Sequence, residues 1–215
     1  MHGSRKPGTR ERLIETAGDL FYRRGFQSVG LDAVLAEVGI SKTAFYKHYE
    51  SKDDLIVDVL RRRDARDIAE ALDYMRRYGG DDPRAQILAF FDHLGEWFRD
   101  PSFRGCLFMN AATEFPEPGD PIHRTAAAHS AHLAAEFRRL VASTGAADPD
   151  GITRQIMLLM GGAISARHVG GVVDAAESAP AGPALLLYPR ANAAAHPAPR
   201  GGRGPQPHRR RAGGG

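Results

Sequence analysis

The chain has 215 residues, of which 42% are hydrophobic, with a single cysteine and a formal net charge of +3. This length allows one large domain or two small ones, and the hydrophobic share predicts a folded core. One cysteine excludes a disulfide within the chain, no apolar run approaches the ~18 residues of a membrane helix, and residues 1–12 are too polar for a signal peptide. We therefore expect a cytoplasmic protein with no membrane partner.

The positive charge belongs to the C-terminal end. Six of the 29 basic side chains follow Glu177, where there is no acidic residue, so the first 177 residues carry 23 basic against 26 acidic side chains. Overall charge is therefore poor evidence for DNA binding. Residues 178–215 also contain seven prolines and seven glycines, a composition that predicts a low-complexity, disordered tail.

Apolar residues at helical spacing predict an all-α fold of about nine helices. Glycine and proline mark many of the expected ends, as at Gly25, Gly39 and Pro83. The helical pattern is lost early after residue 170. The expected helices cover residues 9–25, 31–38, about eight residues from Ser41, 51–78, 83–99, 105–115, 121–144 and 150–170.

Residues 31–52 have the form of a helix-turn-helix, two short helices joined by a turn that contains glycine. Gly39 supplies the left-handed residue that ends the first helix, and Ser41 is expected to cap the second. Phe45 and Tyr49, four positions apart, give the second helix its inward face. The polar side chains that then point away from the core, where DNA would lie, are Lys42, Thr43, Tyr46 and Lys47.

Four short motifs occur in order, namely Leu-Phe…Arg-Gly-Phe, Val-Gly-Ile-Ser-Lys, Phe-Tyr-Lys-His-Tyr and Ser-Lys-Asp-Asp-Leu. With them, residues 9–60 resemble the N-terminal DNA-binding domain of TetR-family transcriptional regulators. The resemblance implies a homodimeric regulator, which we expect to be a repressor, bound to a palindromic double-stranded DNA operator and responsive to a small-molecule effector. It implies neither a cofactor nor enzymatic activity.

The resemblance also divides the chain and assigns roles to residues. We expect a three-helix helix-turn-helix domain at 1–55, a larger α-helical ligand-binding and dimerisation domain at 56–177, and the tail at 178–215. Lys42 and Thr43 fall where the family touches base edges, and a lysine ammonium suits guanine acceptors. Tyr46, Lys47, His48 and Lys52 complete the expected DNA contacts, with Lys52 meeting the DNA backbone from the start of the fourth helix.

Aromatic and methionine residues cluster between positions 90 and 115. Such residues at helical spacing usually form core, and the alternative is that some of them line a ligand cavity in which a few polar groups orient the ligand. The expected pocket residues are His93, Trp97, Phe98, Cys106, Met109, Asn110, Thr113 and Glu114.

Cys106 leaves two interpretations open. It is either a buried, inert thiol or a sensor of oxidants and electrophiles, which requires a depressed pKa from a helix N-terminus or from Arg104. An enzyme with Cys106 as nucleophile and His93 or His123 as base is disfavoured, because the sequence has no nucleophile elbow, glycine-rich phosphate loop or paired-carboxylate motif.

Two further alternatives receive little weight. His123, His129 and His132 share one helix, but without a second cysteine or a histidine-rich partner segment we expect no metal site. We place these histidines at the dimer seam or in solvent. A nonspecific DNA binder that uses the arginine-rich tail is the remaining alternative.

Overall fold

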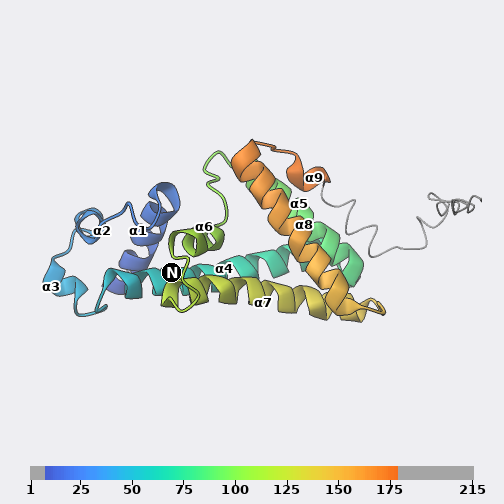
Figure 1. The fold of residues 1–215 in the computed structure, drawn as a ribbon, viewed down its shortest axis with the longest axis horizontal. Helices are drawn as coiled ribbons and strands as arrows, with labels where there is room; N and C mark the ends of the chain where they lie inside the picture. The colour runs from blue at the N-terminus through green and yellow to red at the C-terminus, as the bar shows by residue number, and fades with distance from the viewer. Residues whose placement is uncertain (1–7, 179–215) are drawn as a thin grey trace, which may run out of the picture.

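The computed structural model describes residues 8–178, which form nine α-helices and no strand (Figure 1). The predicted all-α fold is confirmed, and all but the third of the eight helices placed from the sequence begin and end close to their expected bounds. All but the first residue of the predicted tail lies outside the described residues. The helices are α1 Thr9–Arg24, α2 Leu31–Val38, α3 Lys42–Phe45, α4 Lys52–Gly79, α5 Pro83–Arg99, α6 Leu107–Glu114, α7 Pro121–Ser143, α8 Pro149–Gly170 and α9 Ala175–Ser178.

Local chemistry explains the helix ends around α2 and α3. Gly39 adopts φ 73° and ψ 43°, the left-handed conformation that glycine tolerates best, and ends α2. The Ser41 hydroxyl caps α3 by accepting a hydrogen bond from the Ala44 amide. The regular helix α3 is shorter than expected because the backbone tightens after Phe45, where the His48 amide bonds back only three residues, to the Phe45 carbonyl.

One helix was not placed by the sequence. The short helix α9 follows a turn after α8, and its Ala175 and Ala176 are buried. The methyl group of Ala176 packs close to Gly95 of α5. A four-residue helix of small side chains carries too little periodicity to be recognised before its packing partner is known.

The helices are arranged around a long pair that runs in the same direction. Figure 1 shows α4 and α7 side by side along the long axis, with α1–α3 at one end, α5 and α8 at the other, and α6 between them. One hydrophobic core joins α1–α3 to the first half of α4 and to α6, and a second fills the space among α4, α5, α7 and α8. Cys106 packs against both cores, at the point where they meet.

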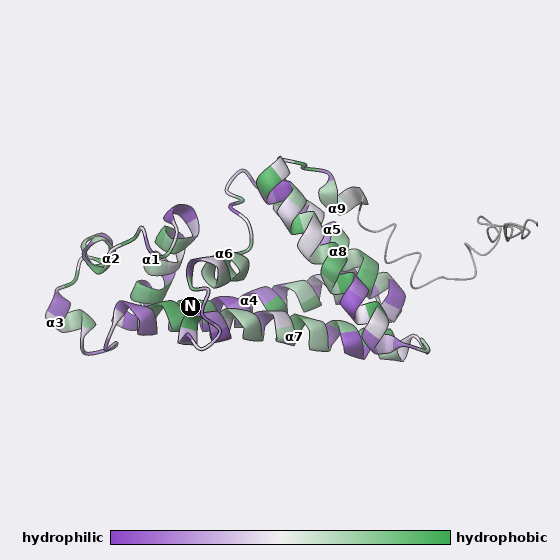
Figure 2. Cartoon of the chain, viewed as in Figure 1, coloured by the Kyte–Doolittle hydropathy of each residue, from purple (hydrophilic) through white to green (hydrophobic). Residues whose placement is uncertain are grey.

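Within residues 8–178, no helix combines the length and apolar character needed to cross a lipid bilayer. Apolar residues nevertheless recur along α8 in Figure 2, and two of them lie largely on the surface. Leu158 is 75% exposed and Val169 is 83% exposed. This helix therefore presents an apolar outer surface that the described chain does not cover.

Candidate nucleic-acid interface and ligand cavity

Two buried aromatic side chains hold α3 on the N-terminal helices. Phe45 is fully buried, and its ring packs against that of Tyr49 at a centroid distance of 5.6 Å. The Tyr49 hydroxyl donates a hydrogen bond to Asp58 of α4 at 2.6 Å. Burial, assisted by this carboxylate, raises the pKa of Tyr49 well above its usual range, so the hydroxyl stays a donor. The inward face of α3 is thus firmly anchored.

The opposite flank of α3 is open to solvent. We define the recognition flank as the five exposed polar residues Lys42, Thr43, Tyr46, Lys47 and His48. The Tyr46 side chain is 56% exposed although its ring lies edge-on to Phe45. No other element covers this flank, as a surface that enters a DNA groove requires (Figure 1).

One side chain of the recognition flank has an acidic neighbour. The Lys42 ammonium lies 2.9 Å from Asp32 of α2, and both side chains are mostly exposed. The hydrogen bond and charge of Asp32 raise the pKa of Lys42. Lys42 therefore stays charged, and Asp32 holds its ammonium near the start of α3.

Lys52, expected to meet the DNA backbone, has partners inside the protein. Its ammonium donates hydrogen bonds to the carbonyl oxygens of Phe26 at 2.8 Å and Val29 at 2.9 Å. The side chain is half-buried at the first residue of α4. Two of the three ammonium donors are therefore taken by carbonyl groups of the α1–α2 connection, and one remains for another partner.

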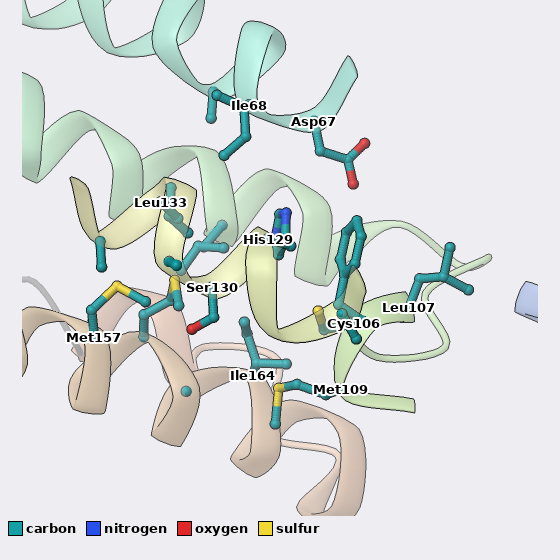
Figure 3. A pocket seen from close by; sticks show the side chains of 18 of the residues that line it. Asp67, Ile68, Cys106, Leu107, Met109, His129, Ser130, Leu133, Met157 and Ile164 are labelled. Carbon is teal, nitrogen blue, oxygen red and sulfur yellow. The ribbon is translucent and has the colours of Figure 1, made fainter. Parts of the chain in front are cut away.

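A cavity of about 950 Å³ opens among α4, α5, α6, α7 and α8. Figure 3 shows side chains from four of these helices converging on it, with Ile68 from α4, Met109 from α6, Leu133 from α7 and Met157 from α8. Most of the wall is aliphatic, aromatic or sulfur-containing. Its volume lies at the upper end of the ~300–1,000 Å³ typical of small-molecule sites.

The expected pocket residues divide into two groups of four. His93 and Trp97 of α5 line the cavity, as do Cys106 and Met109 at the start of α6. The other four, Phe98, Asn110, Thr113 and Glu114, do not.

The residues outside the cavity have identifiable partners. Phe98 is fully buried in the core of the larger helical part. The Asn110 side-chain amide donates to the Arg104 carbonyl at 3.1 Å, and the Thr113 hydroxyl donates to the Met109 carbonyl at 2.9 Å. These polar groups therefore form hydrogen bonds to backbone carbonyls near the start and the end of α6.

Glu114 instead ties α6 to the N-terminal helices. Its carboxylate accepts hydrogen bonds from the backbone amides of Phe26 at 3.0 Å and Gln27 at 2.8 Å. The Gln27 side-chain amide donates in return to the Glu114 carbonyl at 2.6 Å. Nearby, the Phe115 ring meets Phe26 edge-on. Because α6 is only eight residues long, one end forms cavity wall while the other holds the α1–α2 connection.

Sequence reasoning missed the cavity wall contributed by α7 and α8. Ser130 and Leu133 come from α7, and Met157, Met160 and Ile164 come from α8. The i, i+3 spacing of Met157 and Met160 was the available signal. It could not be separated from ordinary core without knowing that α8 packs beside α7 and leaves a gap.

His129, placed at the dimer seam or in solvent by the sequence, lines the cavity. Its ring stacks on Phe108 at a centroid distance of 3.6 Å, and its Nδ1 lies 2.8 Å from Asp64 of α4. Asp64 also meets His132 Nδ1 at 2.7 Å, and His132 is exposed as expected. Burial against α4 and α6 therefore corrects the placement of His129, which joins α4 to α7.

The remaining histidine of α7 also has a hydrogen-bonding partner within the protein. His123 is half-buried, and its Nδ1 lies 2.8 Å from the Phe115 carbonyl oxygen. Among the described residues, no group of three or more histidine, cysteine or acidic side chains has a geometry that could hold a metal ion.

Two titratable residues of the expected pocket, His93 and Cys106, line the cavity and are shifted toward their uncharged forms. Burial raises the pKa of the Cys106 thiol, and the amides of Met109 and Phe108 only partly oppose this effect. Burial likewise lowers the pKa of His93, against the opposing charges of Glu96 and other nearby carboxylates. A neutral thiol and a neutral imidazole therefore face an apolar space at neutral pH.

The chain matches known proteins over both its helical parts. Residues 13–59 match the family model described as bacterial regulatory proteins, tetR family. The crystal structure of SCO4454, a TetR-family transcriptional regulator from Streptomyces coelicolor, is 32% identical in sequence and superposes with a TM-score of 0.75. The match covers 84% of this chain and 95% of SCO4454.

Two relatives from Escherichia coli K12 extend the comparison. The HTH-type transcriptional regulator YjdC is 25% identical over 160 residues, which cover 73% of this chain and 81% of YjdC. The HTH-type transcriptional repressor NemR is 30% identical over 107 residues, or 49% of this chain and 53% of NemR.

Proposed function

The chain belongs to the TetR family of transcriptional regulators, and from this premise we propose that it is a repressor that binds a palindromic operator as a homodimer and releases it when a small molecule fills the cavity. The observation that carries the proposal is the recognition flank. Its five polar side chains are exposed, while Phe45 and Tyr49 on the other side of α3 are buried.

Each member of the flank has a chemistry suited to DNA. Lys42 and Thr43, at the start of α3, are the proposed base readers, since lysine donates to guanine O6 or N7 and the threonine methyl packs on thymine. Tyr46, Lys47 and His48 are the proposed phosphate contacts, which set orientation more than sequence. Lys52 stays a proposed contact to the DNA backbone through its third ammonium donor, while its two carbonyl partners hold it on the α1–α2 connection.

The apolar outer surface of α8 supports pairing of two copies. Leu158 and Val169 are exposed, and nothing lies within 4 Å of where a Cβ would stand on Gly161 or Gly162. A partner helix can therefore approach the backbone closely. Two copies must place their α3 helices about one turn of DNA apart, ~34–36 Å, to meet successive major grooves.

Two elements connect the cavity to the recognition flank. Helix α4 lines the cavity with Ile68 and Ala71, and its first residue, Lys52, binds the α1–α2 connection. Helix α6 lines the cavity with Met109 and accepts a hydrogen bond from the same connection through Glu114. A ligand that favours another position of α4 and α6 would shift the dimer away from the spacing that DNA requires.

Thiol sensing through Cys106 remains the alternative prediction. The relative NemR is a repressor, and Cys106 lines the cavity. The raised pKa of this thiol counts against it, because the thiolate is the reactive form. We therefore give ligand binding, rather than cysteine chemistry, as the primary signal.

In vitro selection from random DNA duplexes, followed by fluorescence anisotropy, tests the proposal. The full chain should enrich a palindrome and bind it as two copies. A chain lacking residues 178–215 should bind the same palindrome with similar affinity, which separates the recognition flank from the basic tail. The proposal would be contradicted if no sequence were enriched, or if removal of residues 178–215 by itself abolished binding.

A further inference from the structure

Each charged side chain of the cavity wall either pairs with another charged group of the protein or is exposed at the edge of the cavity. The Arg63 Nε lies 2.7 Å from the Asp67 carboxylate, and His129 is held by Asp64. Glu70 is mostly exposed and lies 3.7 Å from Arg66. A charged ligand group would therefore find no unpaired counter-charge in the interior of this wall.

Apart from the Cys106 thiol, which is only a weak donor, the remaining polar groups of the wall leave one interior hydrogen-bonding partner. The Thr153 hydroxyl already donates to the Pro149 carbonyl at 2.7 Å, while Ser130 and Arg154 are exposed. His93 is half-buried with its ring against Tyr74 at 4.8 Å. In the part of the chain that the structure describes, neither ring nitrogen of His93 forms a hydrogen bond. A neutral imidazole offers one donor and one acceptor.

We propose that the ligand of this cavity is an uncharged lipophilic molecule with one hydroxyl or carbonyl group that hydrogen-bonds His93. The inference rests on the proposed function in assuming that an effector binds here. An ionised group placed in this space would lose its hydration without a compensating ion pair. An apolar body gains from contact with Trp97, Phe108 and the methionines.

Trp97, the only tryptophan in the sequence, allows binding to be read directly. The full chain is titrated with N-phenyl-1-naphthylamine, an uncharged dye whose absorption overlaps tryptophan emission, and energy transfer from Trp97 reports its entry. The bound dye is then displaced at neutral pH, below micelle-forming concentrations, by three ligands of equal chain length. These are 1-decanol, decanoate and decyltrimethylammonium.

We expect 1-decanol to displace the dye at a concentration at least about tenfold below that of either ion, because only the ions carry an uncompensated charge into the cavity. Displacement by decanoate at an equal or lower concentration would overturn the proposal and point to Arg154 at the rim. The same result with decyltrimethylammonium would overturn it and point to Glu70. A dye that never enters the cavity would also contradict it.

Two variants test the role of His93, with the dissociation constant of the dye measured separately for each. His93→Phe keeps a ring but removes both nitrogens, and should weaken 1-decanol binding about fivefold. His93→Gln keeps a donor and an acceptor, and should stay within about twofold of the wild type. Unchanged binding of 1-decanol by a folded His93→Phe would remove His93 from the proposal. The charge series on the wild-type chain decides the ligand class whether or not the variants fold.

Operator anisotropy separates this inference from the proposed function. If 1-decanol binds in the cavity but never affects release from the selected palindrome, ligand-controlled DNA release is contradicted and the ligand class stands. If an ion binds more tightly and releases the palindrome, the ligand class is contradicted and ligand control stands.

Discussion

Glu114 accepts a hydrogen bond from the backbone amide of Gln27 at 2.8 Å, across 87 residues of sequence. The same carboxylate accepts from Phe26, whose carbonyl oxygen in turn accepts from Lys52. The α1–α2 connection is therefore held from one side by α6 and from the other by the first residue of α4. Any movement of either helix at the cavity must act on this connection.

Replacement of Glu114 by alanine should loosen the α1–α2 connection. The amides of Phe26 and Gln27 would lose a charged acceptor, so we expect faster hydrogen exchange at both and a loss of about 2 kcal/mol in the free energy of unfolding. The matched control is Glu117→Ala, an exposed position whose carboxylate forms no hydrogen bond or ion pair within the described chain. Unchanged exchange at Phe26 and Gln27 would mean that α6 does not hold this segment.

Asp32→Asn should strengthen operator binding several-fold. The change releases Lys42 from its 2.9 Å ion pair and removes a negative charge beside the recognition flank. The slope of log affinity against log salt should also steepen, by up to about one unit. Asp19→Asn, which breaks an exposed ion pair with Arg23 on α1, is the control. Weaker binding by Asp32→Asn would show that Asp32 positions Lys42 for DNA.

Leu158→Glu should convert the proposed dimer to a monomer. The substitution places a charge on the apolar outer surface of α8, where Leu158 is 75% exposed, so it should disturb pairing without unfolding the chain. Light scattering after size-exclusion chromatography gives the mass directly. Tyr78→Glu alters a comparably exposed apolar residue on α4 and should leave the mass unchanged. A dimer that survives Leu158→Glu would exclude this surface.

Cys106 should react slowly with alkylating reagents in the folded protein. Burial raises its thiol pKa, so a smaller fraction is thiolate at neutral pH than in an ordinary cysteine, and the rate should keep rising at pH values where free cysteine has levelled off. The rate of iodoacetamide labelling against pH measures this, with the urea-unfolded chain as control. Labelling faster than that of glutathione at neutral pH would instead favour the thiol-sensing alternative.

The sequence predicted the helices well because their ends are set by local chemistry. Gly39 adopts the left-handed conformation at the end of α2, and Ser41 caps α3. Pro83 begins α5 because proline fits the first turn of a helix. Phe45 and Tyr49 were placed in the core from their spacing alone.

The residues that sequence reasoning misplaced depend on contacts between distant segments. Nothing near Glu114 in the sequence reveals that its carboxylate accepts a hydrogen bond from the Phe26 amide. His129 likewise faces Asp64 only because α7 packs beside α4. A periodic pattern identifies the buried face of a helix, but it does not identify what that face touches.

Affinity cleavage of DNA tests the central claim, that the recognition flank of α3 faces the major groove. Glu50, exposed just beyond the flank, is replaced by cysteine in a Cys106→Ser background and labelled with an iron–EDTA group, and Ser143→Cys at the far end of α7 serves as control. The account predicts cleavage of the selected palindrome at two places about one helical turn apart with the Glu50→Cys chain, and background cleavage with the Ser143→Cys chain. Equal cleavage from both positions, with operator binding intact, would contradict it.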